Sequence, residues 1–305
     1  MVDARPFPRS CVMRAVQMDV HGGPEVLTVR EVPEPVCGPG EVLVRTVASS
    51  LNPVDWKTRA WEETGPALPT TLGWDLAGIV VASRAPGFAP GDRVLAMSAQ
   101  IATGLGTWAE LVALPERLLT PAPATLSLAE AAALPLAGTA AVQAVAALRP
   151  RPGARLLVAG AAGAVGGLAV QLARLAGMTV DGLVSRHGHV AVARELGAAT
   201  VTHDPASLPR GAYDAVLDTA GVDLSASLTE GGRYVSVADT PLPDVPNAAK
   251  SYVQESSTDL ARVVELADAG ALRVRVAEHH PVGRVRTAHE RFEAGGLPGK
   301  VVLLF

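Results

Sequence analysis

The stretch LLVAGAAGAVGGLAVQLARLAG, residues 156–177, runs from an apolar segment into a turn with glycine at every third position, and then into an apolar helix. The glycines are Gly160, Gly163 and Gly166. Glycine lets the chain turn tightly, and it lets the pyrophosphate of a ligand approach the first amides of a helix, where the helix dipole favours negative charge. Strand, turn and helix follow in the order of a dinucleotide-binding fingerprint, here GxxGxxG instead of GxGxxG. The stretch therefore predicts a dinucleotide site, with close helix-on-sheet packing and no ligand as the alternative.

The next apolar segment, TVDGLV at 179–184, indicates which dinucleotide binds. A carboxylate at the end of this strand binds the ribose 2′-hydroxyl of NAD, whereas a cation there accommodates the 2′-phosphate of NADP. The strand is followed by Ser185, Arg186 and His187, and Asp181 comes too early in it to reach the ribose. This pattern favours NADPH over NADH. The alternative is that Ser185 and Arg186 belong to an ordinary solvated loop.

The pattern of predicted secondary structure changes near residue 125. Up to that point short β segments alternate with Gly/Pro turns, which predicts a partly closed antiparallel barrel. Beyond it helices and apolar strands alternate, which predicts crossover units and a parallel sheet. The tail contains both strand and helix patterns but differs from the preceding alternation. We expect it to pack as part of the first domain. The predicted fold is α/β, with a barrel domain at 1–125, a doubly wound parallel-sheet domain at 126–270, and a return to the barrel domain at 271–305.

The composition is that of a globular protein with a small-molecule partner. About half of the 305 residues are hydrophobic and 18% are charged, which excludes wholesale disorder. The net charge of −4, without long runs of one sign, predicts neither a nucleic-acid partner nor a membrane partner. Two cysteines, Cys11 and Cys37, cannot build a disulfide framework, which fits a reducing cytoplasm. Residues 1–20 contain no apolar signal-peptide core, and residues 1–10 are expected to be a loose extension or an artefact of a wrongly chosen start codon.

Several motifs follow one another in a fixed order over nearly the whole chain. They are LNPVDWKTR (51–59), LGWDLAGIVV (72–81), GFAPGDRVLAM (87–97), GTWAELVAL (106–114), ALPLAGTAAVQAV (133–145), the glycine-rich stretch above and GKVVLLF (299–305). In these motifs the chain resembles the zinc-independent quinone oxidoreductases of the medium-chain dehydrogenase/reductase superfamily. The resemblance implies a GroES-like catalytic domain, a Rossmann domain and a site between them. It also implies hydride transfer from NADPH to a quinone or an α,β-unsaturated carbonyl compound.

The resemblance assigns the cofactor-binding residues one at a time. The residues expected to bind the pyrophosphate are Gly160, Ala161, Gly163, Ala164, Val165 and Gly166. Those expected to bind the 2′-phosphate are Ser185, Arg186, His189 and His203. Relatives commonly carry lysine and tyrosine in place of these two histidines, so a weaker or pH-sensitive affinity for NADPH is expected. Thr139 matches the residue near the nicotinamide ribose, with a buried threonine bonded to its own helix backbone as the alternative.

Two residues of the LNPVDWKTR motif are candidates for the catalytic role. Asn52 matches the family's residue near nicotinamide and substrate, and Lys57 is placed to donate to the substrate oxygen as negative charge develops there. The alternatives are a turn-capping asparagine and a solvated surface lysine. Asp55 and Asp75 are interpreted as structural. Lys300, in the terminal motif, lies either near the cofactor or on the surface.

Zinc-dependent relatives hold their metal with cysteine and histidine ligands. Here the cysteine position falls within LNPVDWK, and the Gly-His-Glu stretch of those relatives is replaced by GWD at 73–75. We therefore expect no metal. Trp56, Trp61 and Trp108 either line an apolar substrate pocket or belong to the barrel core.

The expected function is thus NADPH-dependent reduction of a quinone or an α,β-unsaturated carbonyl compound. One alternative is an enoyl-thioester or biosynthetic-pathway enoyl reductase, which shares the same hydride chemistry. The other alternative is not an enzyme but a protein that binds NADPH without turnover. By resemblance a homodimer is expected, with the segment SYVQE (251–255) forming a strand that pairs with its own copy.

Overall fold

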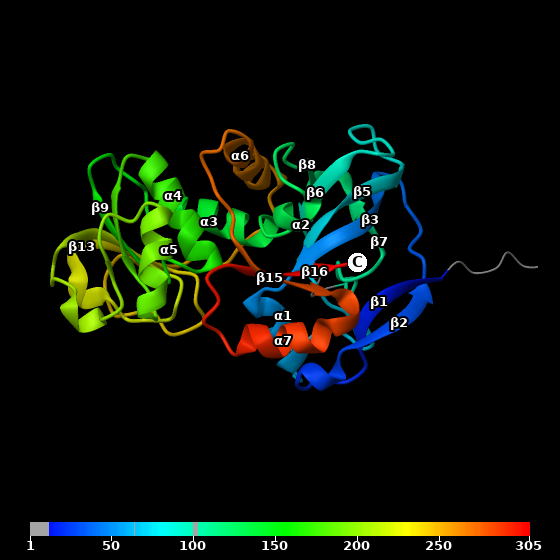
Figure 1. Ribbon diagram of the computed structural model, residues 1–305, viewed down its shortest axis with the longest axis horizontal. Helices are drawn as coiled ribbons and strands as arrows, with labels where there is room; N and C mark the ends of the chain where they lie inside the picture. Colours follow the sequence, from blue (N-terminus) through cyan, green and yellow to red (C-terminus); the bar gives the residue numbers. More distant parts are fainter. Residues whose placement is uncertain (1–11, 64, 100–102) are drawn as a thin grey trace, which may run out of the picture.

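The computed structural model describes residues 12–63, 65–99 and 103–305. The expectations for residues 1–10 and for Cys11 lie outside these ranges. Two bodies lie side by side along the longest axis of the molecule (Figure 1). One is built from the first part of the chain together with the C-terminal tail, whose red segment lies among blue and cyan strands. The other is built from the middle of the chain.

The first body is dominated by a seven-stranded sheet of order β15-β16-β3-β5-β6-β8, with β7 also paired to β3. Its strands are β3 (Glu41–Ser50), β5 (Asp75–Ser83), β6 (Arg93–Met97), β7 (Leu111–Pro115), β8 (Leu119–Pro121), β15 (Val276–Pro281) and β16 (Lys300–Leu304). The pairings are antiparallel except for β15 with β16. A smaller antiparallel sheet joins β2 (Thr28–Pro33), β1 (Val12–Met18) and β4 (Thr70–Thr71). The predicted GroES-like barrel is confirmed.

The C-terminal tail completes this first body. Strand β16 pairs antiparallel with β3, with Val302 opposite Ser50, and its residues Val301, Val302 and Leu303 are fully buried. Between β15 and β16 lies helix α7 (Val285–Glu293), which packs on α1 (Pro53–Ala60) through a buried Arg59. The tail therefore returns to the sheet of the first domain, while the domain boundaries themselves stay a prediction.

The second body contains a six-stranded sheet whose pairings are all parallel, in the order β11-β10-β9-β12-β13-β14. Its strands are β9 (Arg155–Ala159), β10 (Thr179–Leu183), β11 (Val201–Thr202), β12 (Tyr213–Asp218), β13 (Leu228–Ser236) and β14 (Ala248–Lys250). This is the 3-2-1-4-5-6 order of the Rossmann fold, which confirms the predicted doubly wound sheet. The order reverses between β9 and β12, where such sheets bind their ligands at the carboxyl ends of the strands.

Helices cover the parallel sheet and join it to the barrel. They are α2 (Leu128–Ala131), α3 (Pro135–Ala147), α4 (Ala164–Leu175), α5 (Val190–Glu195) and α6 (Ser257–Asp268). Short 3-10 turns lie at Pro24–Val26, Glu116–Leu118, His187–His189, Pro205–Ser207, Ser225–Ser227 and Val282–Arg284. Among the helices of the described residues, none combines the length and apolar character that a membrane span needs.

Helix α3 is the seam between the two bodies. It is rich in alanine, and a Cβ on Gly138 would lie only 2.8 Å from Val263 of α6, so small side chains let the two helices approach closely. One hydrophobic cluster runs from the barrel residue Ala77 through Ala137 of α3 to Leu156 of β9. Because the core continues from one body into the other, side chains at the seam are held in fixed positions.

One sequence-based expectation about the second body is wrong. Strand β14 ends at Lys250, and residues 251–255 are not a strand. The backbone N–H of Gln254 donates instead to the side chain of Gln143 on α3, at 2.9 Å. This bond draws the segment toward α3 and into the start of α6, so the edge of the sheet is β14 itself.

Candidate active site

The glycine turn joins β9 to α4 at the carboxyl end of the parallel sheet. Gly160 has a φ of 76°, and a Cβ there would lie 2.4 Å from Thr219 Oγ1. A Cβ on Gly166 would lie 2.2 Å from the carbonyl oxygen of Gly160. Real Cβ atoms do not come so close to other atoms, so only glycine fits at either position. The turn thus presents backbone, not side chains, at the start of α4.

A pocket of about 370 Å³ opens beside this turn, which is a size typical of small-molecule sites. Five of the predicted cofactor residues line it: Gly160, Gly163, Ser185, His189 and His203. The other residues assigned to the pyrophosphate lie in and under the turn without lining this pocket: Ala161, Ala164, Val165 and Gly166. The C-terminal tail contributes Gly296 and Leu297, which the sequence did not indicate.

The side chains around this pocket suit an anion. The guanidinium of Arg186 lies against Gly296, because a Cβ on that glycine would be 2.2 Å from Arg186 Cζ. His203 packs edge-on against His187, with ring centroids 5.3 Å apart. No carboxylate is among the residues that line the pocket. Basic groups thus gather at one place from the loops after β10 and β11.

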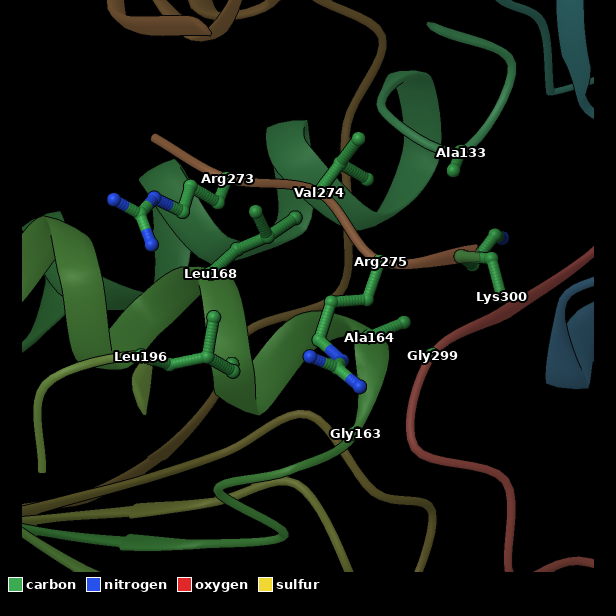
Figure 2. Close-up of a pocket in the computed structure, with 11 residues that line it drawn as sticks. Ala133, Gly163, Ala164, Leu168, Leu196, Arg273, Val274, Arg275, Gly299 and Lys300 are labelled. Carbon is green, nitrogen blue, oxygen red and sulfur yellow. The ribbon is translucent and has the colours of Figure 1, made fainter. Parts of the chain in front are cut away.

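A smaller crevice of about 10 Å³ lies where the tail crosses the start of α4 (Figure 2). Arg275 of the tail and Gly163 and Ala164 of the turn all line it. In Figure 2 the Arg275 side chain extends from the tail toward Ala164. Its guanidinium donates to Glu195 at 3.4 Å. The N-terminus of a helix already carries positive potential, so a cation beside it suits an anionic ligand at the turn. Nothing in the sequence around Arg275 marked it for this place.

Where the two bodies meet, a cation and a carboxylate are buried together. Lys300 is 3% exposed, and its ammonium donates to Leu51 O at 2.8 Å, Asn52 Oδ1 at 2.5 Å and Asp75 Oδ2 at 3.2 Å. The other oxygen of Asp75 accepts from the backbone N–H of Leu136 in α3, at 2.7 Å. A surface position for Lys300 is therefore wrong. An ammonium stays charged in such a place only when a carboxylate and further acceptors compensate for the lost water.

Asn52 is held between these two charges. Its Nδ2 donates to Asp75 Oδ2 at 2.8 Å, while its Oδ1 accepts from Lys300. Asn52 is also the N-cap residue of α1, and its backbone N–H donates to Asp55 Oδ2 at 2.7 Å. Both ends of the amide are thus fixed by protein groups, so its orientation is set before any ligand binds. We call Asn52, Asp55, Asp75 and Lys300 the charge cluster.

Asp55 is the carboxyl of the charge cluster whose pKa is raised. Burial raises the pKa of its carboxyl to about 8, and the negative charge of Asp75 acts in the same direction. The hydrogen bond from the Asn52 backbone and the charge of Lys300 oppose this shift without cancelling it. Asp55 therefore carries a proton at neutral pH. The pair of Lys300 and Asp75 is then balanced, with no second carboxylate charge beside it.

Lys57 lies on α1 and forms a contact with the second body. Its ammonium forms an ion pair with Asp239, in the loop that follows β13. The Lys57 side chain is 25% exposed, and its ammonium lies 5.7 Å from the centre of the Trp56 ring. Lys57 is thus a partly exposed lysine with an ion-pair partner, and its catalytic role stays a prediction. Nothing in the sequence marked Asp239 as the partner of Lys57.

Thr139 is fully buried in α3, and its hydroxyl has no hydrogen-bond partner within the described part of the chain. The alternative that it bonds its own helix backbone is therefore wrong. A buried hydroxyl without a partner is uncommon in proteins and is suited to a bound ligand. Trp108 is fully buried in the barrel core, whereas Trp61 is 37% exposed. Trp74 packs with Leu136 of α3, its buried Nε1 has no hydrogen-bond partner among the described residues, and it was not singled out from the sequence.

The residues at the expected zinc position do not suit a metal ion. Within residues 12–63, 65–99 and 103–305, no three His, Cys, Asp or Glu side chains gather as metal ligands would. The ammonium of Lys300 already neutralises Asp75, and it would repel a cation placed beside that carboxylate. The amide of Asn52 is likewise occupied.

Comparison with known proteins gives matches along the whole chain. The family model of the alcohol dehydrogenase GroES-like domain matches residues 38–124, and that of the zinc-binding dehydrogenases matches residues 189–303. A chloroplast envelope quinone oxidoreductase homolog of Arabidopsis thaliana is 32% identical over 334 residues, which cover 96% of this chain and 98% of the relative. The chloroplastic NADPH-dependent alkenal/one oxidoreductase of the same plant is 30% identical, over 95% of this chain and 79% of the relative.

Solved structures agree with these matches. The structure of the quinone oxidoreductase from Coxiella burnetii superimposes with a TM-score of 0.86 at 28% sequence identity. The superposition covers 97% of this chain and 100% of that one. Both bodies and their arrangement are therefore shared with that protein.

Proposed function

Because the chain belongs to the quinone oxidoreductase family of the medium-chain dehydrogenase/reductase superfamily, we propose that it reduces a quinone or an α,β-unsaturated carbonyl compound with NADPH, without a metal. The observation that carries this proposal is the pocket beside the glycine turn. Its turn admits only glycine at Gly160 and Gly166, His189 and His203 line it, and Arg186 lies against the lining residue Gly296; among the described lining residues none is a carboxylate. NADPH is the dinucleotide with an additional phosphate that needs such groups.

The residues present fit the proposed cofactor. The backbone of the glycine turn would hold the pyrophosphate, with Arg275 beside it. The groups for the 2′-phosphate are Ser185, Arg186, His189 and His203. The unpartnered hydroxyl of Thr139 would bond the nicotinamide ribose. NADPH, when bound, supplies the hydride.

The chain's own groups would prepare the substrate. As hydride arrives, negative charge develops on the carbonyl or quinone oxygen, and a donor held in a fixed position stabilises it. The ammonium of Lys57 is the donor we propose. Asn52, locked by Asp75 and Lys300, would form a rigid wall that keeps the reacting groups in place. The proton that completes reduction would come from water.

We also propose a homodimer and a cytoplasmic location, both of which the family resemblance implies. Strand β14 is one edge of the six-stranded sheet, and an edge strand can pair with a second copy.

The experiment is an acceptor panel. The protein is mixed with NADPH and, separately, benzoquinone, naphthoquinone, 2-alkenals or crotonyl thioesters, and the loss of nicotinamide absorbance is followed. Turnover with quinones or alkenals supports the proposal, whereas turnover with thioesters alone favours an enoyl-thioester reductase. Binding of NADPH with no turnover of any acceptor would leave only a cofactor-binding protein. Equal efficiency with NADH would refute the choice of NADPH.

A further inference from the structure

The ion pair between Lys57 and Asp239 links the two bodies of the molecule. Lys57 lies on α1 in the barrel body, five positions after the buried Asn52. Asp239 follows β13 of the parallel sheet and has a side chain that is 52% exposed. The contact therefore lies at an accessible place between the bodies, in contrast to the dry charge cluster.

The loop that carries Asp239 begins at the ligand-binding edge of the sheet. Its strand β13 ends at Ser236, which pairs with Asp218 at the end of β12. Asp218 in turn pairs with Ala159, the residue before the glycine turn. The carboxylate of Asp239 therefore belongs to the same edge as the predicted dinucleotide site.

This loop is fixed from within its own body. The ammonium of Lys250 donates to the carbonyl oxygens of Ala238 and Thr240, which flank Asp239 on both sides. The backbone N–H of Ala238 donates to Ser236 Oγ at 3.2 Å. Because both neighbours are tied down, the carboxylate of Asp239 is presented in a defined position.

A lysine side chain gains most from such a fixed partner. Its four-carbon stem is flexible, and holding it in one rotamer costs side-chain entropy. An ammonium carries three N–H donors. Within the described part of the chain, Asp239 accepts the one hydrogen bond that Lys57 Nζ forms, so two donors remain for a ligand.

We propose that Asp239 is a positioning residue, whose carboxylate holds the ammonium of Lys57 in place so that its free N–H groups meet the oxygen of the substrate. This inference rests on the proposed reductase function. Asp239 touches Lys57, not the reacting atoms, so its effect on turnover passes through Lys57.

A double-mutant cycle with a quinone acceptor tests this proposal. We expect Asp239→Asn to lower kcat about tenfold with the KM for NADPH within about twofold, since only transition-state stabilisation is weakened. We expect Lys57→Met to lower kcat at least as far, and the double variant to match Lys57→Met alone. Asp239→Glu should recover most of the loss. Asp244→Asn, an exposed carboxylate in the same loop region, is the matched control and should turn over like the wild type.

Chemical labelling gives a readout that needs no turnover. The chain has three lysines, Lys57, Lys250 and Lys300, so an amine-reactive reagent followed by mass spectrometry reports on each separately. Lys57 should react several-fold faster in Asp239→Asn than in the wild type, while Lys300 stays unreactive in both. The inference would be overturned if the double variant lost kcat by the product of the two single fold-losses. It would also be overturned if Lys57 were labelled at the same rate in Asp239→Asn and in the wild type. If no acceptor is reduced, faster labelling would retain the ion pair as a tether while the reductase function fails.

Discussion

The glycine turn and the charge cluster meet at one crevice, where Gly163 and Lys300 are both lining residues, yet their chemistry differs (Figure 2). The glycine turn belongs to the parallel-sheet body, and its backbone leaves no room for a side chain at Gly160 or Gly166. The charge cluster belongs mainly to the barrel body and consists of side chains that bind one another. One region is constrained by steric contacts and the other by electrostatic compensation.

This difference predicts different responses to mutation. A side chain added to the turn meets backbone atoms that cannot move far, so the damage is local and falls on ligand binding. A charge removed from the cluster leaves its partner buried and uncompensated, so the damage falls on the stability of the whole fold. Each of the following changes tests one side of this comparison.

The largest effect is expected from Lys300→Met. The change leaves the Asp75 carboxylate buried without its cation, which typically costs about 3–5 kcal/mol in the free energy of unfolding. Denaturant unfolding measures this loss. The double change Lys300→Met with Asp75→Asn removes both charges and should recover a substantial part of it. Loss of stability below about 1 kcal/mol for the single variant would mean that the pair is not buried as described.

Gly166→Val should abolish most cofactor binding. Its Cβ would lie 2.2 Å from Gly160 O, so the turn must open, and we expect the Kd for NADPH to rise more than about 100-fold, a factor that corresponds to about 2.7 kcal/mol. Nicotinamide fluorescence measures the affinity. Gly188→Ala is the matched control, because nothing lies within 4 Å of a Cβ there. Similar affinities for the two variants would contradict the role of the turn.

Asp55→Asn should change the pH dependence of stability. The folded carboxyl has its pKa raised to about 8, above its unfolded value, so the wild-type protein binds an extra proton when folded and loses stability as pH rises toward 8. Asparagine does not titrate. The stability of the variant relative to wild type should therefore rise by roughly 2.5 kcal/mol between about pH 5.5 and about pH 7.5. Thermal unfolding at several pH values measures it, and a constant difference would show that Asp55 is ionised when folded.

The smallest effect is expected from Arg186→Ala. Arg186 lies at the rim of the pocket against Gly296, so its loss should raise the KM for NADPH about tenfold and leave that for NADH unchanged. Steady-state kinetics with both nucleotides measures the ratio. Arg210→Ala, another exposed arginine of the same body, serves as control. An equal change for the two nucleotides would show that Arg186 does not bind the 2′-phosphate.

Much of the fold and part of the site could be predicted because their signals are local. Alternation of apolar strands and helices indicated the parallel sheet, and glycine spacing located the turn within a single stretch. The basic residues after β10 followed from their place at a strand end. Each of these predictions needed only residues that are neighbours in the chain.

The parts that were missed depend on distant segments. Lys300 resembles an ordinary strand-end lysine until β16 places it beside Asn52 and Asp75, more than 200 positions away. Arg275 and Asp239 reach their places only through the crossing of the tail and the packing of α1 toward the parallel sheet. Trp108 could not be assigned to core or pocket from its type, because both environments favour an aromatic ring.

By itself the sequence determined a Rossmann sheet, a barrel, and a turn that needs glycine, since backbone geometry and hydrophobic periodicity are written in consecutive residues. Only the tertiary structure decided which charges are buried and which partners they have. Electrostatic free energy depends on distance and on the exclusion of water, and both are set when segments far apart in the chain pack together.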